Sequence, residues 1–143
     1  MSLWMRRFWC GLTRNEAVTA PDAWDPRLRG RTYAIPFDRV WRAATSLASG
    51  GLRGWSLVSA DDFEGEIHAA SRARLRDRYY DITIRITLDQ DGQTRVDARA
   101  SSRTGRVDFG ANARRIGRFF TALDRALAQE PAQAGGWSGA TSP

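Results

Sequence analysis

Residues 79–102, YYDITIRITLDQDGQTRVDARASS, carry the pattern that decides the fold. Apolar side chains occupy alternate positions on both sides of a polar segment at 90–92. This alternation predicts two antiparallel strands joined by a three-residue loop, with Gly92 in the left-handed conformation. The register that keeps both apolar faces together gives the pairs Ile86–Val96, Ile84–Ala98, Arg85–Asp97 and Asp81–Ser101.

Helical and strand patterns flank this hairpin. Residues 37–48 and 109–129 repeat apolar side chains at intervals of three and four, which predicts two helices. Residues 55–58 and 66–73 are typical of short strands. The fold class we expect is therefore α+β, with a single antiparallel sheet of about four strands and two main helices packed on one face.

Composition divides the 143 residues into three parts. Residues 1–30 are rich in Trp and Pro without a sustained period and are interpreted as an N-terminal docking arm. Residues 31–130 form the α+β domain, and residues 131–143 form a low-complexity C-terminal tail.

Aromatic and basic side chains in the arm and the tail suggest attachment to a partner. Trp beside Arg is typical of interfacial membrane anchors and of protein-interface hot spots. An arm that is disordered or folded back on its own domain is the alternative. The docking residues we expect are Trp4, Arg6, Arg7, Phe8, Trp9, Trp24 and Trp137.

All 22 basic residues are arginine, and the net charge is +6. Because arginine binds phosphates and carboxylates through a planar fork, the partners we expect are protein subunits of a membrane complex, anionic lipid headgroups, or both. A GC-rich coding sequence would explain the preference for arginine over lysine equally well. Nucleic acid is not expected, since acidic residues are interleaved throughout and no nucleic-acid-binding motif is present.

Metal, cofactor and catalytic signals are weak. A single cysteine, Cys10, excludes an internal disulfide and a multi-cysteine zinc site, and we expect no metal and no cofactor. Ser101, His68 and Asp81 could form a Ser–His–Asp arrangement on the polar sheet face, but no nucleophile elbow or oxyanion loop accompanies them. The sequence therefore predicts a protein that is not an enzyme.

The N-terminus does not have the form of a secretory signal, because Arg6 and Arg7 interrupt its apolar residues. The longest apolar runs are far below the roughly 20 residues that a transmembrane helix needs. We expect a cytoplasmic protein, peripheral on the inner face of a membrane.

Residues 99–116, RASSRTGRVDFGANARRI, are the most distinctive stretch. They resemble the signature of the family named domain of unknown function 1499 (DUF1499), and the similarity extends over about residues 31–128. The resemblance implies a fold and no activity. One departure is Tyr80-Asp81, where family members tend to have paired aspartates. The matching positions are Ser102, Arg103, Gly105, Asp108, Gly110, Asn112, Arg115 and Ile116.

Two interpretations of this signature stay open. In the first, it is a structural junction: Gly105 provides a turn, Asp108 caps the following helix, and Gly110 allows another backbone to approach closely. In the second, Arg103 and Arg106 converge with the N–H groups at the helix start on an anion. Asp108 argues against the second, because its carboxylate would occupy the same positive end.

These patterns favour a non-enzymatic accessory or scaffold subunit that docks at the cytoplasmic face of a membrane-bound complex, for example a respiratory or photosynthetic one. The alternative is a small anionic-ligand-binding or hydrolytic domain. It would use the polar sheet face around Asp81, Arg99 and Arg103.

Overall fold

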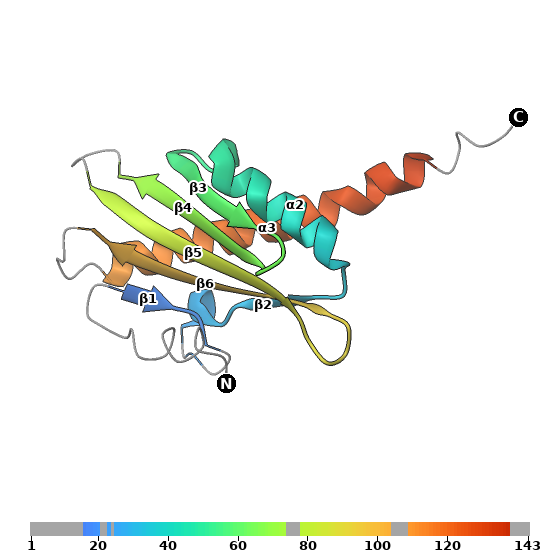
Figure 1. The fold of residues 1–143 in the computed structure, drawn as a ribbon, viewed down its shortest axis with the longest axis horizontal. Coiled ribbons are helices and arrows are strands. Elements are labelled where there is room, and N and C mark those ends of the chain that lie inside the picture. The colour runs from blue at the N-terminus through green and yellow to red at the C-terminus, as the bar shows by residue number, and fades with distance from the viewer. Residues whose placement is uncertain (1–15, 21–22, 24, 74–77, 104–108, 138–143) are drawn as a thin grey trace, which may run out of the picture.

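The computed structural model describes residues 16–20, 23, 25–73, 78–103 and 109–137. Figure 1 shows its elements along the chain. In order they are β1 (Glu16–Val18), the 3₁₀ turn η1 (Pro26–Leu28), β2 (Arg31–Tyr33), α2 (Phe37–Ser46), the π-turn η2 (Leu47–Gly51), β3 (Trp55–Asp61), β4 (Glu66–Arg72), β5 (Tyr79–Leu88), β6 (Thr94–Ser102) and α3 (Phe109–Trp137).

The strands form one antiparallel sheet in the order β1-β6-β5-β4-β3, and β2 also pairs with β6. The predicted fold class, α+β with one antiparallel sheet and two main helices, is confirmed. The predicted number of about four strands is wrong, because the sheet has six. The two missed strands, β1 and β2, are three residues each and too short to show a period. They lie one after the other along β6.

Thr19 forms hydrogen bonds with the part of β6 that lies between these two short strands. Its N–H donates to the Ala98 carbonyl at 2.9 Å, and its hydroxyl accepts from the Ala98 N–H at 3.0 Å. The same hydroxyl donates to Asp97 at 2.9 Å. Ala17 and Leu28 are buried in the core. The folded domain therefore begins before Arg31 and includes part of the segment predicted to be an arm.

The central hairpin has the predicted register. All four expected pairs, from Ile86–Val96 to Asp81–Ser101, lie opposite each other on β5 and β6, and Gly92 has the expected positive φ of 75°. The buried face of β5 packs in one apolar cluster with α3. The fully buried side chains of this cluster include Ile82, Ile84 and Ile86 from β5 and Ile116, Phe120 and Leu123 from α3.

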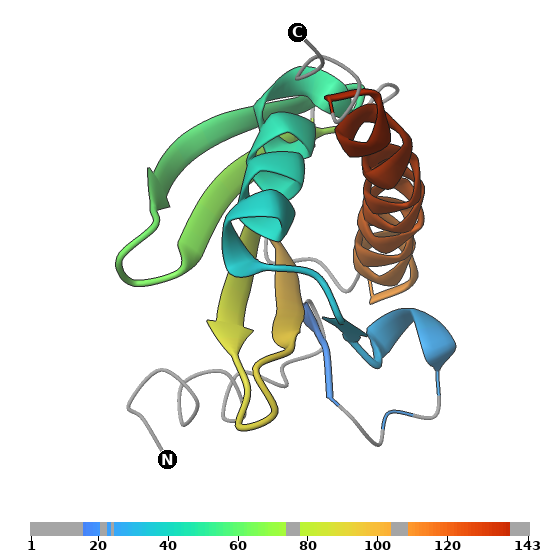
Figure 2. The same cartoon turned by 90° about the vertical axis from the view of Figure 1, so that its right-hand side faces the viewer.

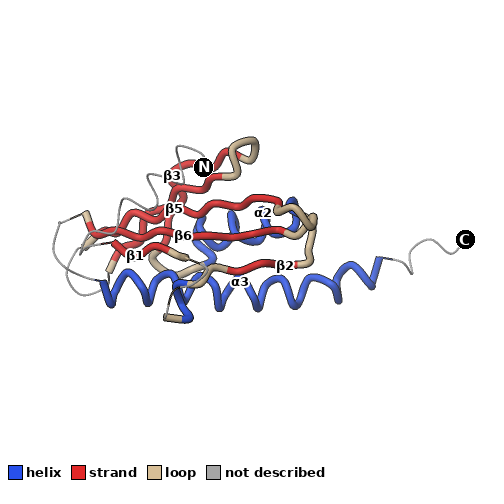
Figure 3. Tube along the Cα trace, turned by 90° about the horizontal axis from the view of Figure 1, so that it is seen from below, coloured by secondary structure: helices blue, strands red, loops and turns tan. Residues whose placement is uncertain are grey.

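The helices α2 and α3 run side by side against the sheet (Figure 2). Helix α2 starts after Pro36, and the π-turn that follows it ends in Gly50 and Gly51. Helix α3 is longer than the expected 109–129 and continues to Trp137. Its last turns extend past the end of the sheet (Figure 3). Neither helix, over the residues described, is long and apolar enough to span a membrane.

Candidate functional site

An open hollow of about 630 Å³ lies at the end of the sheet where β4 ends and β3 begins. Four of its seven lining residues are arginine and none is acidic. We call it the arginine pocket. Its lining residues are Arg53, Gly54, Ser71, Arg72, Ala73, Arg115 and Arg118.

A tight turn holds two of these arginines together. Gly54 has a φ of 83° and its carbonyl accepts a hydrogen bond from the Arg72 N–H at 3.0 Å. A Cβ at position 54 would lie 3.1 Å from the Arg72 carbonyl oxygen. Glycine therefore allows the turn that carries Arg53 to close onto the end of β4, which carries Arg72.

Helix α3 contributes the other two arginines. The Arg115 guanidinium carbon lies 3.6 Å from the centre of the buried Tyr80 ring. Its Nε donates to Ser71 Oγ at 3.2 Å. Arg118 follows one turn later and is exposed. Neither Arg53 nor Arg118 has an ion pair or hydrogen bond with the described part of the chain.

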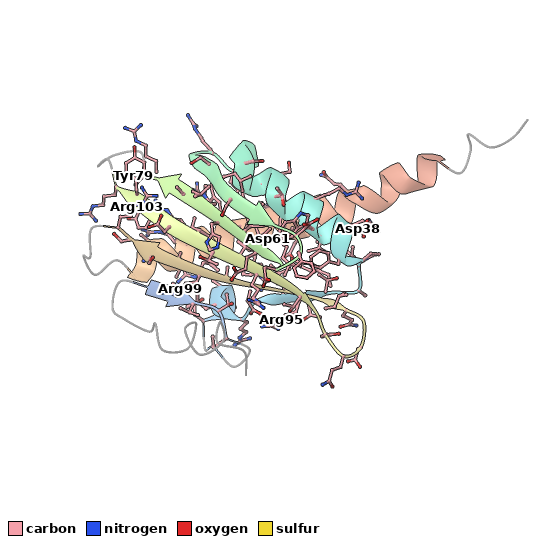
Figure 4. The ribbon with its side chains drawn as sticks, in the orientation of Figure 1. Asp38, Asp61, Tyr79, Arg95, Arg99 and Arg103 are labelled. Atoms are coloured by element: carbon pink, nitrogen blue, oxygen red, sulfur yellow. The ribbon has the colours of Figure 1, made fainter. Side chains whose placement is uncertain are left out.

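The polar face of the sheet differs, because carboxylates pair with three of its arginines. Arg103 contacts Asp81 at 2.8 Å, and this hydrogen bond raises the pKa of the guanidinium. Two further ion pairs lie on strands of the sheet: Arg95–Asp97 at 3.0 Å and Arg85–Glu66 at 3.5 Å. Figure 4 shows Arg103 and Tyr79 together at the end of the sheet where β5 begins. Arg53 and Arg118 of the arginine pocket have no such partner among the described residues.

The signature residues that the structure describes do not gather at one site. Only Arg115 lines the pocket, while Arg103 pairs with Asp81 on the polar sheet face. Asn112 is fully buried. No described atom lies within 4 Å of a Cβ built on Gly110, so the expected close backbone approach is not found among the described residues. Gly105, Arg106 and Asp108 lie outside the described residues.

The predicted docking residues have no described side chains. Trp4, Arg6, Arg7, Phe8, Trp9 and Trp24 lie outside the described residues. For Trp137 only the backbone is described, as the end of α3.

The suggested Ser–His–Asp arrangement is only partly assembled. Asp81 and Ser101 face each other as predicted, but His68 Nδ1 lies 3.3 Å from Thr83 Oγ1 and its Nε2 lies 3.7 Å from Glu66. The Asp81 carboxylate is paired with Arg103. Within the described residues, no group of three or more His, Cys, Asp or Glu is placed to hold a metal ion.

The family model for a protein of unknown function, DUF1499, matches residues 10–123. The chain belongs to the DUF1499 family. The matched region includes all six strands and every residue of the arginine pocket. It starts well before residue 31, where the similarity was expected to begin, in agreement with the place of β1 in the sheet. No curated protein matches the chain.

Three pocket arginines, at positions 53, 72 and 118, were missed in the sequence. A usable signal was present, because residues 72–78 carry arginine at every second position. Arg115 and Arg118 also stand three residues apart, which places them on neighbouring parts of one helix face. Nothing in the local sequence links these positions to the turn at Arg53.

Proposed function

We propose that this DUF1499 protein is a non-enzymatic binding domain whose arginine pocket holds an anionic ligand. The observation that carries the proposal is the presence of four arginines, and of no acidic residue, among the described residues that line one hollow. Like charges gathered in one hollow repel each other, and a bound anion removes this unfavourable electrostatic energy. A phosphate or carboxylate group also matches the planar fork of arginine.

The composition of the pocket favours binding over catalysis. Ser71 supplies the only hydroxyl among the lining residues, and its oxygen accepts the hydrogen bond from Arg115. A serine nucleophile needs an adjacent base to take its proton. Among the described residues that line the pocket there is no histidine, cysteine or carboxylate that could do so.

Thermal unfolding in the presence of small anions tests this function. A ligand that binds only the folded state raises the midpoint of unfolding as its concentration rises. Glycerol 3-phosphate should therefore stabilise the full chain, and the double variant Arg53→Gln/Arg118→Gln should lose most of that response. Arg29→Gln/Arg42→Gln, which removes the same charge at two positions outside the pocket, is the matched control. Equal stabilisation of all three proteins would contradict an anion site in the pocket.

An accessory or scaffold subunit on a membrane-bound complex at its cytoplasmic face is the second candidate function. An exposed apolar pair favours it: Phe63 is 92% and Leu88 61% exposed, and both line a hollow of about 310 Å³. Asp61 fixes the turn that presents Phe63 by accepting the Phe63 and Glu64 N–H groups at 3.1 and 3.2 Å. A fixed, exposed aromatic side chain is typical of an interface anchor.

Co-purification with solubilised native membranes tests this second function. The full chain should elute with a complex at a constant ratio, and Phe63→Ser/Leu88→Ser should elute alone while keeping its midpoint of unfolding. A truncation that tests the predicted arm should remove residues 1–15 only, because β1 starts at Glu16. Elution of the full chain as a free monomer would contradict the accessory role.

A further inference from the structure

Helix α3 presents a straight row of arginines that continues from the arginine pocket. Arg114, Arg118 and Arg125 are exposed and lie within about 40° of one another around the helix axis, over about 16 Å of its length. The buried side chains of α3, such as Ile116 and Leu123, point the opposite way. The row therefore faces away from the sheet.

A second hollow, of about 510 Å³, runs along this row and shares Arg118 with the arginine pocket. Leu52, Gly117 and Ala122 give it apolar atoms between the cations. Arg27 on its rim is neutralised by Asp25 at 2.8 Å. Arg114 and Arg125 have no ion pair or hydrogen bond with the described residues.

We infer that this face of α3 binds the anionic headgroups of a lipid bilayer, which rests on the proposed anion-binding function. A bilayer offers many phosphates in one plane, so it can meet the row and the pocket together, whereas a soluble phosphate ester occupies one hollow. Glycerol and acyl carbons lie next to each lipid phosphate and match the apolar atoms around Leu52. A nucleic-acid duplex keeps the apolar faces of its bases stacked inside and leaves these atoms uncovered.

Vesicle flotation tests the inference with the full chain. Vesicles of phosphatidylcholine and phosphatidylglycerol in equal parts should bind it, and vesicles of phosphatidylcholine alone should not. Each arginine near an anionic surface contributes about a fivefold factor in binding. Arg114→Gln/Arg125→Gln should therefore bind the anionic vesicles about 25-fold more weakly. Arg29→Gln/Arg42→Gln, which removes the same charge elsewhere, should lose much less.

A second readout separates the two proposals. Arg114 and Arg125 lie outside the arginine pocket, so glycerol 3-phosphate should stabilise the Arg114→Gln/Arg125→Gln variant as much as the natural chain. If the ester stabilises both proteins but vesicle binding is absent or is equal in the two double variants, the bilayer inference is wrong and the anion site stands. Stronger competition by duplex DNA than by anionic vesicles also overturns it. No response to ester or vesicles overturns both proposals.

Discussion

The guanidinium of Arg115 lies 3.6 Å from the centre of the Tyr80 ring, in stacking contact. Tyr80 is buried in β5, and Arg115 also donates to Ser71 on β4 and to the Ala111 carbonyl within α3. One signature arginine thus joins the helix to two strands. It also lines the arginine pocket.

Replacing Arg115 should therefore affect both stability and binding. Arg115→Met should lower the free energy of unfolding by about 1–2 kcal/mol, because the cation–π contact with a buried ring is lost. Arg118→Met, on the exposed side of the same helix, should change it by less than about 0.5 kcal/mol. Chemical denaturation measures both. Equal losses of unfolding free energy in the two variants would show that the contact between Arg115 and Tyr80 does not stabilise the fold.

A hydrogen bond between Tyr33 and Asp124 should make stability depend on alkaline pH. The Tyr33 hydroxyl donates to Asp124 at 2.6 Å and joins β2 to α3. Burial, reinforced by this hydrogen bond, raises the pKa of Tyr33 above its usual value of about 10. A raised pKa means that the stabilisation is complete below about pH 10 and is lost as the pH rises further.

The test is Tyr33→Phe, compared with the natural chain at neutral and alkaline pH. Near neutral pH the variant should be less stable by about 1.5 kcal/mol, since a hydrogen bond to a charged group is lost. Above about pH 10 the natural chain should lose stability more steeply than the variant. Parallel pH profiles would contradict the assignment.

Much of the fold could be predicted because its strongest elements have local patterns. The alternation in residues 79–102 was enough for the complete register of β5 and β6. By contrast, β1 and β2 are strands only because β6 offers an open edge, and Thr19 becomes a bridge only beside Ala98. Contacts between residues about 80 positions apart leave no local period to find.

Gly65 should be intolerant of any side chain. Its φ is 72°, and a Cβ would lie only 2.3 Å from the Ile86 carbonyl oxygen. Gly65→Ala should therefore cost more than the roughly 1 kcal/mol that positive φ alone costs. Gly92→Ala is a matched control, because Gly92 has a similar φ of 75° and open space around it. If thermal unfolding shows equal losses of stability for Gly65→Ala and Gly92→Ala, the turn before β4 adjusts to the added methyl group without strain.

Phe120 should be among the most costly side chains to remove. It is fully buried and lies edge-on to Phe119, with a ring separation of 5.4 Å. Phe120→Ala should lower stability by about 3–5 kcal/mol, the usual loss for a buried aromatic residue. Phe63→Ala removes the same side chain from an exposed position and should be nearly neutral. A small loss at Phe120 would contradict the packing of α3 on the sheet.

The candidate site was less predictable than the fold. The signature led to Arg115 and Arg103, but the tertiary structure gives them different surroundings, one lining the arginine pocket and one beside Asp81. The pocket arises where a turn, a strand end and a helix meet, at Arg53, Arg72 and Arg118. That meeting depends on the sheet order, which the sequence patterns did not reveal.

An NMR titration of the ¹⁵N-labelled chain with glycerol 3-phosphate tests the anion site most directly, because it locates the ligand. We expect saturable shifts of the backbone amides of Gly54, Ala73 and Arg115, with little change at Asp81 and Thr83 on the polar sheet face. Shifts centred on Asp81 and Thr83 would move binding to that face. If no saturable shift occurs at the arginine pocket, the pocket does not bind the anion.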